Sequence, residues 1–182
     1  LLTEGAGTLD SSAFRRALEE KAITMDIEAE QDRLRVHIYC LREHAVRAGE
    51  LLALALSKPQ LAEADQARMK ADLSSLLARM AERPDYQAER LLSERSFKGH
   101  PYANAPYGTP ASLAALTAQD VRDCLGTYVS RGNLLVAASG DVDASLLRSV
   151  LEPVVDALEA NDAGAVAVTQ TTLQGGGETL HK

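Results

Sequence analysis

The sequence predicts an α+β domain in which helices pack on one face of a mostly antiparallel sheet. Residues 23–30 alternate apolar and polar side chains, and residues 34–41 are rich in β-branched and aromatic side chains, which together indicate a β-hairpin. Apolar residues at helical spacing dominate most of the remaining chain. An unbroken apolar run at residues 133–140 predicts a further, buried strand.

Composition excludes several classes of protein. The chain has 182 residues, of which 46% are hydrophobic and 25% charged, as in an ordinary globular domain. A net charge of −7 without a Lys/Arg cluster argues against binding to nucleic acid or anionic lipid. No apolar run is long enough to span a bilayer. We expect one domain over residues 1–160 and a Gly-rich linker over residues 161–182, leading to a further domain.

The first half of the chain carries clear start and stop signals. Asp10 or Ser11 can cap a short amphipathic helix. The hairpin that follows is expected to turn at residues 32–33. A helix over residues 43–57 should then end before Pro59, because proline cannot continue it.

Helices are expected through most of the second half. The longest covers residues 63–82, and Pro84 ends it. A second covers residues 85–97. After the predicted strand, residues 143–159 form the last amphipathic helix.

The loop "SFKGHPYANAPYGTPASLAALT", residues 96–117, combines a histidine with tyrosines, prolines and glycines. Thr109 and Thr117 are each expected to cap a helix. The loop offers His100 no carboxylate and no Gly-x-Ser-x-Gly nucleophile turn. Its X-Pro bonds stiffen the chain. We therefore predict a structural role for His100.

The other histidines and the cysteines do not form a recognisable site. His37 and His44 straddle a strand-to-helix junction and lack the one-turn spacing of zinc-binding histidines. His181 falls in the expected linker. Cys40 and Cys124 are expected to be buried, inert thiols, although the sequence leaves a bridge between them open. We expect no catalytic and no metal-binding residue.

Two stretches resemble a known family. "FKGHPYANAPYGTPASLAALTAQDVRDCLGTYVSRGNLLVAASGDVD" resembles the corresponding stretch of the M16 zinc metallopeptidases, the pitrilysin, insulinase and mitochondrial processing peptidase group. "LLTEGAGTLDSSAFRRALEEKAI" is similar to the part that follows that family's metal-binding helix. The resemblance implies an M16 peptidase-like domain that is N-terminally incomplete, with the place of the family's His-x-x-Glu-His motif before Leu1.

The resemblance also implies a departure from the active members. A further glutamate ligand would be expected in the helix that leads to Pro84, where this chain has Ser74, Ser75 or Leu76. Asp72 is the only nearby acid, and it is shorter and in a different register. We therefore expect no cofactor in this chain, with zinc held by a catalytic partner or by an active parent.

In active relatives, the substrate peptide adds as a strand beside an edge that contains Asn-Ala. The matching stretch here is "AITMDIEA", with Met25 and Asp26 in place of Asn-Ala. Backbone pairing itself needs no particular side chain. The candidate peptide-pairing residues are Ile23, Thr24, Met25, Asp26, Ile27 and Glu28.

Three functions follow from the resemblance. The first is a non-catalytic domain that partners a homologous zinc-bearing M16 subunit in peptide proteolysis, as a heterodimer. The second is a truncated domain of an active zinc endopeptidase whose motif lies before Leu1. The third is a binding or scaffold module with no link to proteolysis. Similarity to short paired bacterial members also implies a periplasmic or exported protein.

Overall fold

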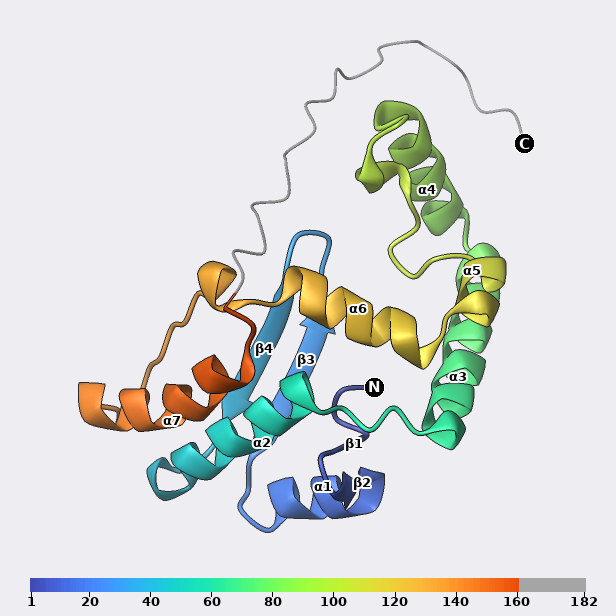
Figure 1. Ribbon diagram of the computed structural model, residues 1–182. Coiled ribbons are helices and arrows are strands. Elements are labelled where there is room, and N and C mark those ends of the chain that lie inside the picture. The colour runs from blue at the N-terminus through green and yellow to red at the C-terminus, as the bar shows by residue number, and fades with distance from the viewer. Residues whose placement is uncertain (161–182) are drawn as a thin grey trace. The chain divides into compact units, whose positions relative to one another are not determined.

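A computed structural model describes residues 1–160, and these residues form two compact units (Figure 1). The first unit contains residues 1–69 and 117–160, and the second contains residues 70–116. The predicted linker, residues 161–182, lies outside the described residues.

The elements of the first unit are two short hairpins and a set of helices. They are β1 (Gly5–Ala6), β2 (Leu9–Asp10), α1 (Ser11–Glu19), β3 (Thr24–Ala29), β4 (Leu34–Tyr39), η1 (Arg42–His44), α2 (Ala45–Ser57), α6 (Ala118–Tyr128), η3 (Arg131–Asn133) and α7 (Ala144–Ala157).

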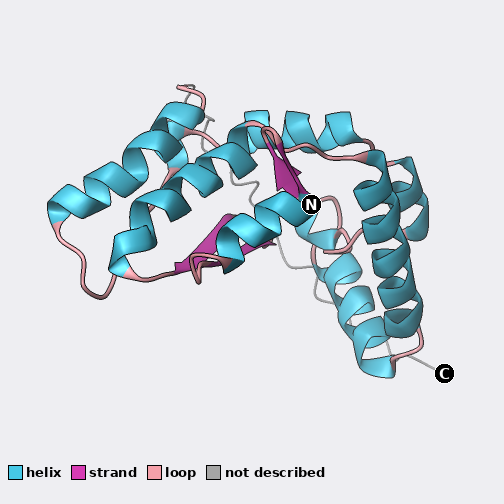
Figure 2. Ribbon diagram, turned by 90° about the horizontal axis from the view of Figure 1, so that it is seen from below, coloured by secondary structure: helices cyan, strands magenta, loops and turns pink. Residues whose placement is uncertain are grey.

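Helix α3 (Glu63–Ala81) begins in the first unit and continues into the second. The second unit also contains α4 (Pro84–Ser96), η2 (Pro101–Ala103) and α5 (Pro110–Ala115). Its buried apolar side chains are Leu77 and Leu113, so its core is small. Most of the ribbon is helical (Figure 2), and within residues 1–160 no helix has the length and apolar character to cross a membrane.

The predicted hairpin is confirmed. β3 and β4 pair antiparallel, from Thr24 opposite Tyr39 to Ala29 opposite Leu34. The expected α+β class also holds, but the described residues contain two separate two-stranded sheets, β1–β2 and β3–β4, and not one larger sheet.

The prediction of a buried strand at residues 133–140 is wrong. These residues belong to no strand, and the side chain of Leu135 is 94% exposed. An apolar run becomes a buried strand only when neighbouring strands supply hydrogen bonds and a core. Within residues 1–160, no strand pairs with this segment.

The predicted helix caps at Asp10, Thr109 and Thr117 are confirmed. The Asp10 carboxylate accepts a hydrogen bond from the backbone N–H of Ala13, at 2.8 Å, and so begins α1. Thr109 and Thr117 each form a reciprocal capping box at the starts of α5 and α6. Each cap satisfies N–H groups that a helix start leaves without a partner.

The main core lies where α1 and α2 cover the apolar face of the β3–β4 hairpin. Phe14 and Leu51 are fully buried in it, beside Ile23 and Met25. On another side, α2 packs against α7, and Ala53 and Leu56 meet Val154 and Leu158 there. Helix α2 therefore takes part in both clusters.

Helices α2 and α7 run side by side in the same direction (Figure 1), and Gly49 of α2 lies close to the backbone of Val150 in α7. A Cβ atom added to Gly49 would lie 2.2 Å from the carbonyl oxygen of Val150. That distance is well inside van der Waals contact, and the obstacle is backbone that cannot rotate away. Only glycine allows this helix spacing.

We predict that Gly49→Ala lowers the free energy of unfolding by about 1 to 3 kcal/mol, because the added methyl group overpacks the α2–α7 contact. Urea unfolding followed by circular dichroism measures the change. Gly126→Ala is the matched control, since a Cβ there meets no atom within 4 Å and alanine favours α6 by up to about 1 kcal/mol. Equal effects of the two substitutions would contradict this account of the helix contact.

Candidate functional site

The candidate peptide-pairing residues, 23–28, lie along β3 and the residue before it. One edge of β3 pairs with β4. Within residues 1–160, no strand pairs with its other edge. Backbone hydrogen-bonding groups along such an edge can template an added strand. The geometry is compatible with peptide addition, which stays a prediction.

The side chains of β3 divide between its two faces. Ile23 and Met25 are buried in the main core, at 5% and 7% exposure. Thr24, Asp26 and Glu28 point to the opposite face and are exposed. A peptide at this edge would therefore meet the backbone and polar side chains, because the apolar ones are already used in packing.

The exposed face of the hairpin carries both signs of charge. Asp26 stands opposite His37, and Glu28 stands opposite Arg35. The guanidinium of Arg35 also lies 2.9 Å from the carboxylate of Glu30. Cross-strand neighbours of opposite sign attract each other modestly. This face consequently presents a balanced polar surface.

The position expected for the family's glutamate ligand lies in the middle of α3. Ser74 and Ser75 are exposed there, and Leu76 is half-buried. The hydroxyl of Ser75 donates a hydrogen bond to the carbonyl oxygen of Ala71 in its own helix, at 3.0 Å. Asp72 is exposed on the same helix. Across residues 1–160, no three His, Cys, Asp or Glu side chains gather closely enough to hold a metal ion.

His37, His44 and His100 occupy separate elements. His37 is exposed on β4, whereas His44 is half-buried in η1, with its imidazole 3.8 Å from the carboxylate of Glu43. His100 belongs to the second unit. His181 lies outside the described residues.

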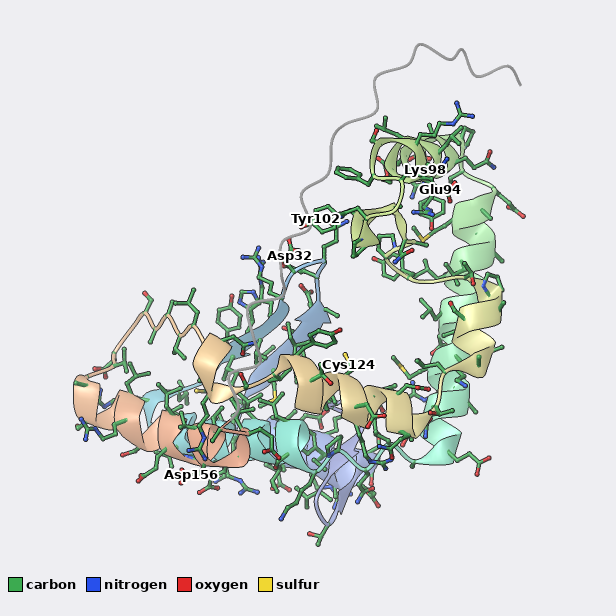
Figure 3. The ribbon with its side chains drawn as sticks, turned by 45° about the horizontal axis from the view of Figure 1, so that its top comes forward. Asp32, Glu94, Lys98, Tyr102, Cys124 and Asp156 are labelled. Atoms are coloured by element: carbon green, nitrogen blue, oxygen red, sulfur yellow. The ribbon has the colours of Figure 1, made fainter. Side chains whose placement is uncertain are left out.

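His100 is part of an aromatic cluster after α4. Its Nδ1 atom accepts a hydrogen bond from the backbone N–H of Tyr102, at 3.2 Å, and so caps η2. The two rings meet edge to face, with centroids 4.7 Å apart. Phe97 adds a second edge-on contact with Tyr102, at 5.6 Å between centroids. Figure 3 labels Tyr102 in this loop, beside the end of α4. These contacts support the structural role predicted for His100.

Both cysteines are free thiols. Cys40 is half-buried against the main core, and its burial raises the pKa of the thiol. Cys124 is exposed on α6 and is labelled in Figure 3. The bridge that the sequence left open is therefore not formed. A raised thiol pKa agrees with the inert role expected for Cys40. The expectation that Cys124 is buried is wrong, because its position on α6 is exposed.

An ionic clamp that no local sequence pattern predicts joins η1 to the start of α7 within the first unit. Arg42 donates hydrogen bonds to the backbone carbonyl of Asp141, at 2.7 Å, and to the carboxylate of Asp143. That carboxylate also caps α7 by accepting from the hydroxyl of Ser145 and the backbone N–H of Leu146. These hydrogen bonds, Ser145 first, hold the pKa of Asp143 far below its usual range. The cap was visible in the sequence, but its arginine partner lies about a hundred residues earlier.

We predict that His100→Ala lowers the free energy of unfolding by about 1 kcal/mol, because it removes the cap of η2 and a ring contact. His100→Asn is the matched control, since its amide oxygen can accept from the same N–H group and should recover part of the loss. Urea unfolding measures both. Unchanged stability combined with loss of an activity of the intact protein would contradict the structural role.

No family model matches the sequence. Over 150 residues, 81% of this chain, it is 26% identical to the non-peptidase homolog YmxG of Helicobacter pylori. The chain spans about a third, 35%, of the length of that relative.

Solved structures share the fold. The inactive domain of a peptidase M16 from Pseudomonas fluorescens superposes with a TM-score of 0.79 at 24% identity, over 86% of this chain and 39% of that one. Pitrilysin superposes with a TM-score of 0.78 at 13% identity, over 95% of this chain and 19% of that one. The chain thus has the M16 peptidase-like fold, and its sequence is similar to that of a non-peptidase homolog.

Proposed function

We propose that this chain is a non-catalytic M16 domain that works with a homologous zinc-bearing subunit or domain in peptide proteolysis. The observation that carries the proposal is the middle of α3, which has Ser74 and Ser75 where the family resemblance places an acidic ligand. Similarity to a non-peptidase homologue and to an inactive M16 domain supports it.

The ligand chemistry explains why this substitution matters. Zinc in such enzymes is held by imidazole and carboxylate groups, and a neutral serine hydroxyl is no substitute for a carboxylate. Asp72 cannot simply take over. On a helix it is rotated by about 200° from Ser74, and it lies about 6 Å along the axis from Leu76. The side chain of Asp72, which is shorter than that of glutamate, would have to span this displacement to reach the metal.

The edge of β3 gives such a domain a way to hold substrate without performing chemistry. An extended peptide can pair with backbone groups of residues 23–28 and need not contact a specific side chain. Because Ile23 and Met25 are buried, the edge would discriminate little among apolar peptide side chains. In this proposal, β3 helps to enclose a peptide, and cleavage belongs to the partner's zinc.

The second candidate is a truncated domain of an active zinc endopeptidase whose His-x-x-Glu-His motif precedes Leu1. The presence of Asp72 within one helical turn of the expected ligand position favours it. The two candidates differ in where the metal is held. The periplasmic or exported location remains a further proposal.

We predict that the purified chain retains far less than one zinc ion per molecule after dialysis, because no three His, Cys, Asp or Glu side chains of residues 1–160 gather closely enough to hold a metal ion. Elemental analysis by mass spectrometry measures this. Asp72→Ala and His100→Ala should leave the metal content unchanged. One tightly held zinc ion per chain that either substitution removed would overturn the proposal.

We also predict that co-expression of the full-length protein with a homologue bearing His-x-x-Glu-His yields a complex with more peptidase activity than either protein alone. Cleavage of an unfolded peptide measures this activity. Replacing the motif glutamate of the homologue by glutamine is the control, and it should abolish cleavage. If the full-length protein cleaves peptides unaided and zinc chelators inhibit it, the second candidate is correct.

A further inference from the structure

Two carboxylates lie beside the edge of β3 that faces away from β4. Asp26 and Glu28 are both exposed on the outward face of the hairpin. Side chains alternate between the two faces of a strand, so Ile27, which lies between them, packs against the main core instead. Thr24, the other residue of this outward row, is uncharged. A strand that paired with this edge would therefore place its own outward side chains beside the two carboxylates.

Neither carboxylate is neutralised by direct contact with a side chain of residues 1–160. Within these residues, no hydrogen bond or ion pair joins Asp26 or Glu28 to another side chain. Glu30, at the turn of the hairpin, differs from them, because it forms ion pairs with both Arg33 and Arg35. The nearest basic side chains are therefore already paired with Glu30, and the negative charge along β3 remains available.

The basic side chains of the outward face lie along β4. Arg35 stands opposite Glu28. His37 stands opposite Asp26, and its ring stacks parallel to that of Tyr39, with centroids 6.4 Å apart. The face as a whole is balanced in charge, but its acids follow β3 and its bases follow β4. A strand that approached the edge of β3 would consequently meet the acids first.

We propose that the edge of β3 prefers extended peptides that carry two basic side chains, Lys or Arg, two residues apart. On neighbouring strands, the Cβ atoms of directly opposite residues lie about 4.5–5.5 Å apart, and opposite charges at such positions attract each other. Alternate residues share a face whether the peptide runs parallel or antiparallel to β3, so the spacing matches Asp26 and Glu28 in both directions. The inference rests on the proposed function, because it assigns a class of peptide to the same edge.

The charge of the whole chain acts in the same direction. Its net charge of −7 attracts cationic peptides and repels acidic ones, and it also repels a second copy of the chain. Backbone hydrogen bonds hold the peptide at the edge, whereas Asp26 and Glu28 determine which peptides bind best. These two residues are specificity-determining residues and take no part in cleavage.

The test compares the binding of three end-capped peptides to the full 182-residue chain. Each peptide has about nine residues, a typical strand length, in which Val and Thr alternate. Two successive Thr positions are replaced by Lys in the first peptide, by Gln in the second and by Glu in the third. At low ionic strength, fluorescence anisotropy should show that the Lys peptide binds about fivefold more tightly than the Gln peptide, and the Glu peptide most weakly.

Substitutions separate the local charge of β3 from the charge of the whole chain. Asp26→Asn combined with Glu28→Gln removes both carboxylates, so it should abolish the preference for Lys and retain the affinity for the Gln peptide. Glu152→Gln combined with Asp156→Asn is the matched control, since it removes the same two charges from exposed positions of α7, where Figure 3 labels Asp156. This control should keep the preference. All four positions are exposed, so the melting temperature should change little.

Hydrogen exchange distinguishes a failure of this inference from a failure of the proposed peptide edge. Pairing with a peptide should slow exchange of amides within residues 24–28. If all three peptides slow it equally, the edge binds peptides but the charge preference is wrong. A preference for Lys that persists after Asp26→Asn and Glu28→Gln would also overturn the inference, because its source would then be the net charge. If no peptide slows exchange, both the preference and the role of the β3 edge are contradicted.

Discussion

The close contact between α2 and α7 at Gly49 is the constraint on which the first unit depends. Helix α2 packs against the hairpin and α1 on one side and against α7 on another, so its position couples the two apolar clusters. Because Gly49 has no side chain, the backbone of α2 can lie directly against the backbone of α7. The position of α7 in turn places Asp143 within reach of Arg42.

The same packing determines which surfaces remain for binding. Helices α1 and α2 cover the apolar face of the β3–β4 hairpin. Only the edge of β3 and its polar face therefore remain available for binding. The β3 edge is therefore the strand-accepting surface that the proposed function uses in this unit.

The similarity to known proteins and the chemistry of α3 support the proposed function independently of each other. Relatives described as non-peptidase or inactive share the fold or part of the sequence. Separately, α3 has serine where the family resemblance places an acidic ligand, and Asp72 lies at a different position along the helix. The binding role proposed here needs only the packed scaffold and its exposed strand edge, because function depends on the site that a fold carries.

The sequence alone determined the features that depend on near neighbours. Caps at Asp10, Thr109 and Thr117, the β3–β4 hairpin and the family resemblance could all be read from it, because each rests on residues a few positions apart. Tertiary structure decided the rest. The apolar run at residues 134–139 looks like a buried strand, yet whether it is one depends on a distant strand that residues 1–160 do not supply. The Arg42 clamp and the Gly49 contact likewise join residues about a hundred positions apart, which no local pattern encodes.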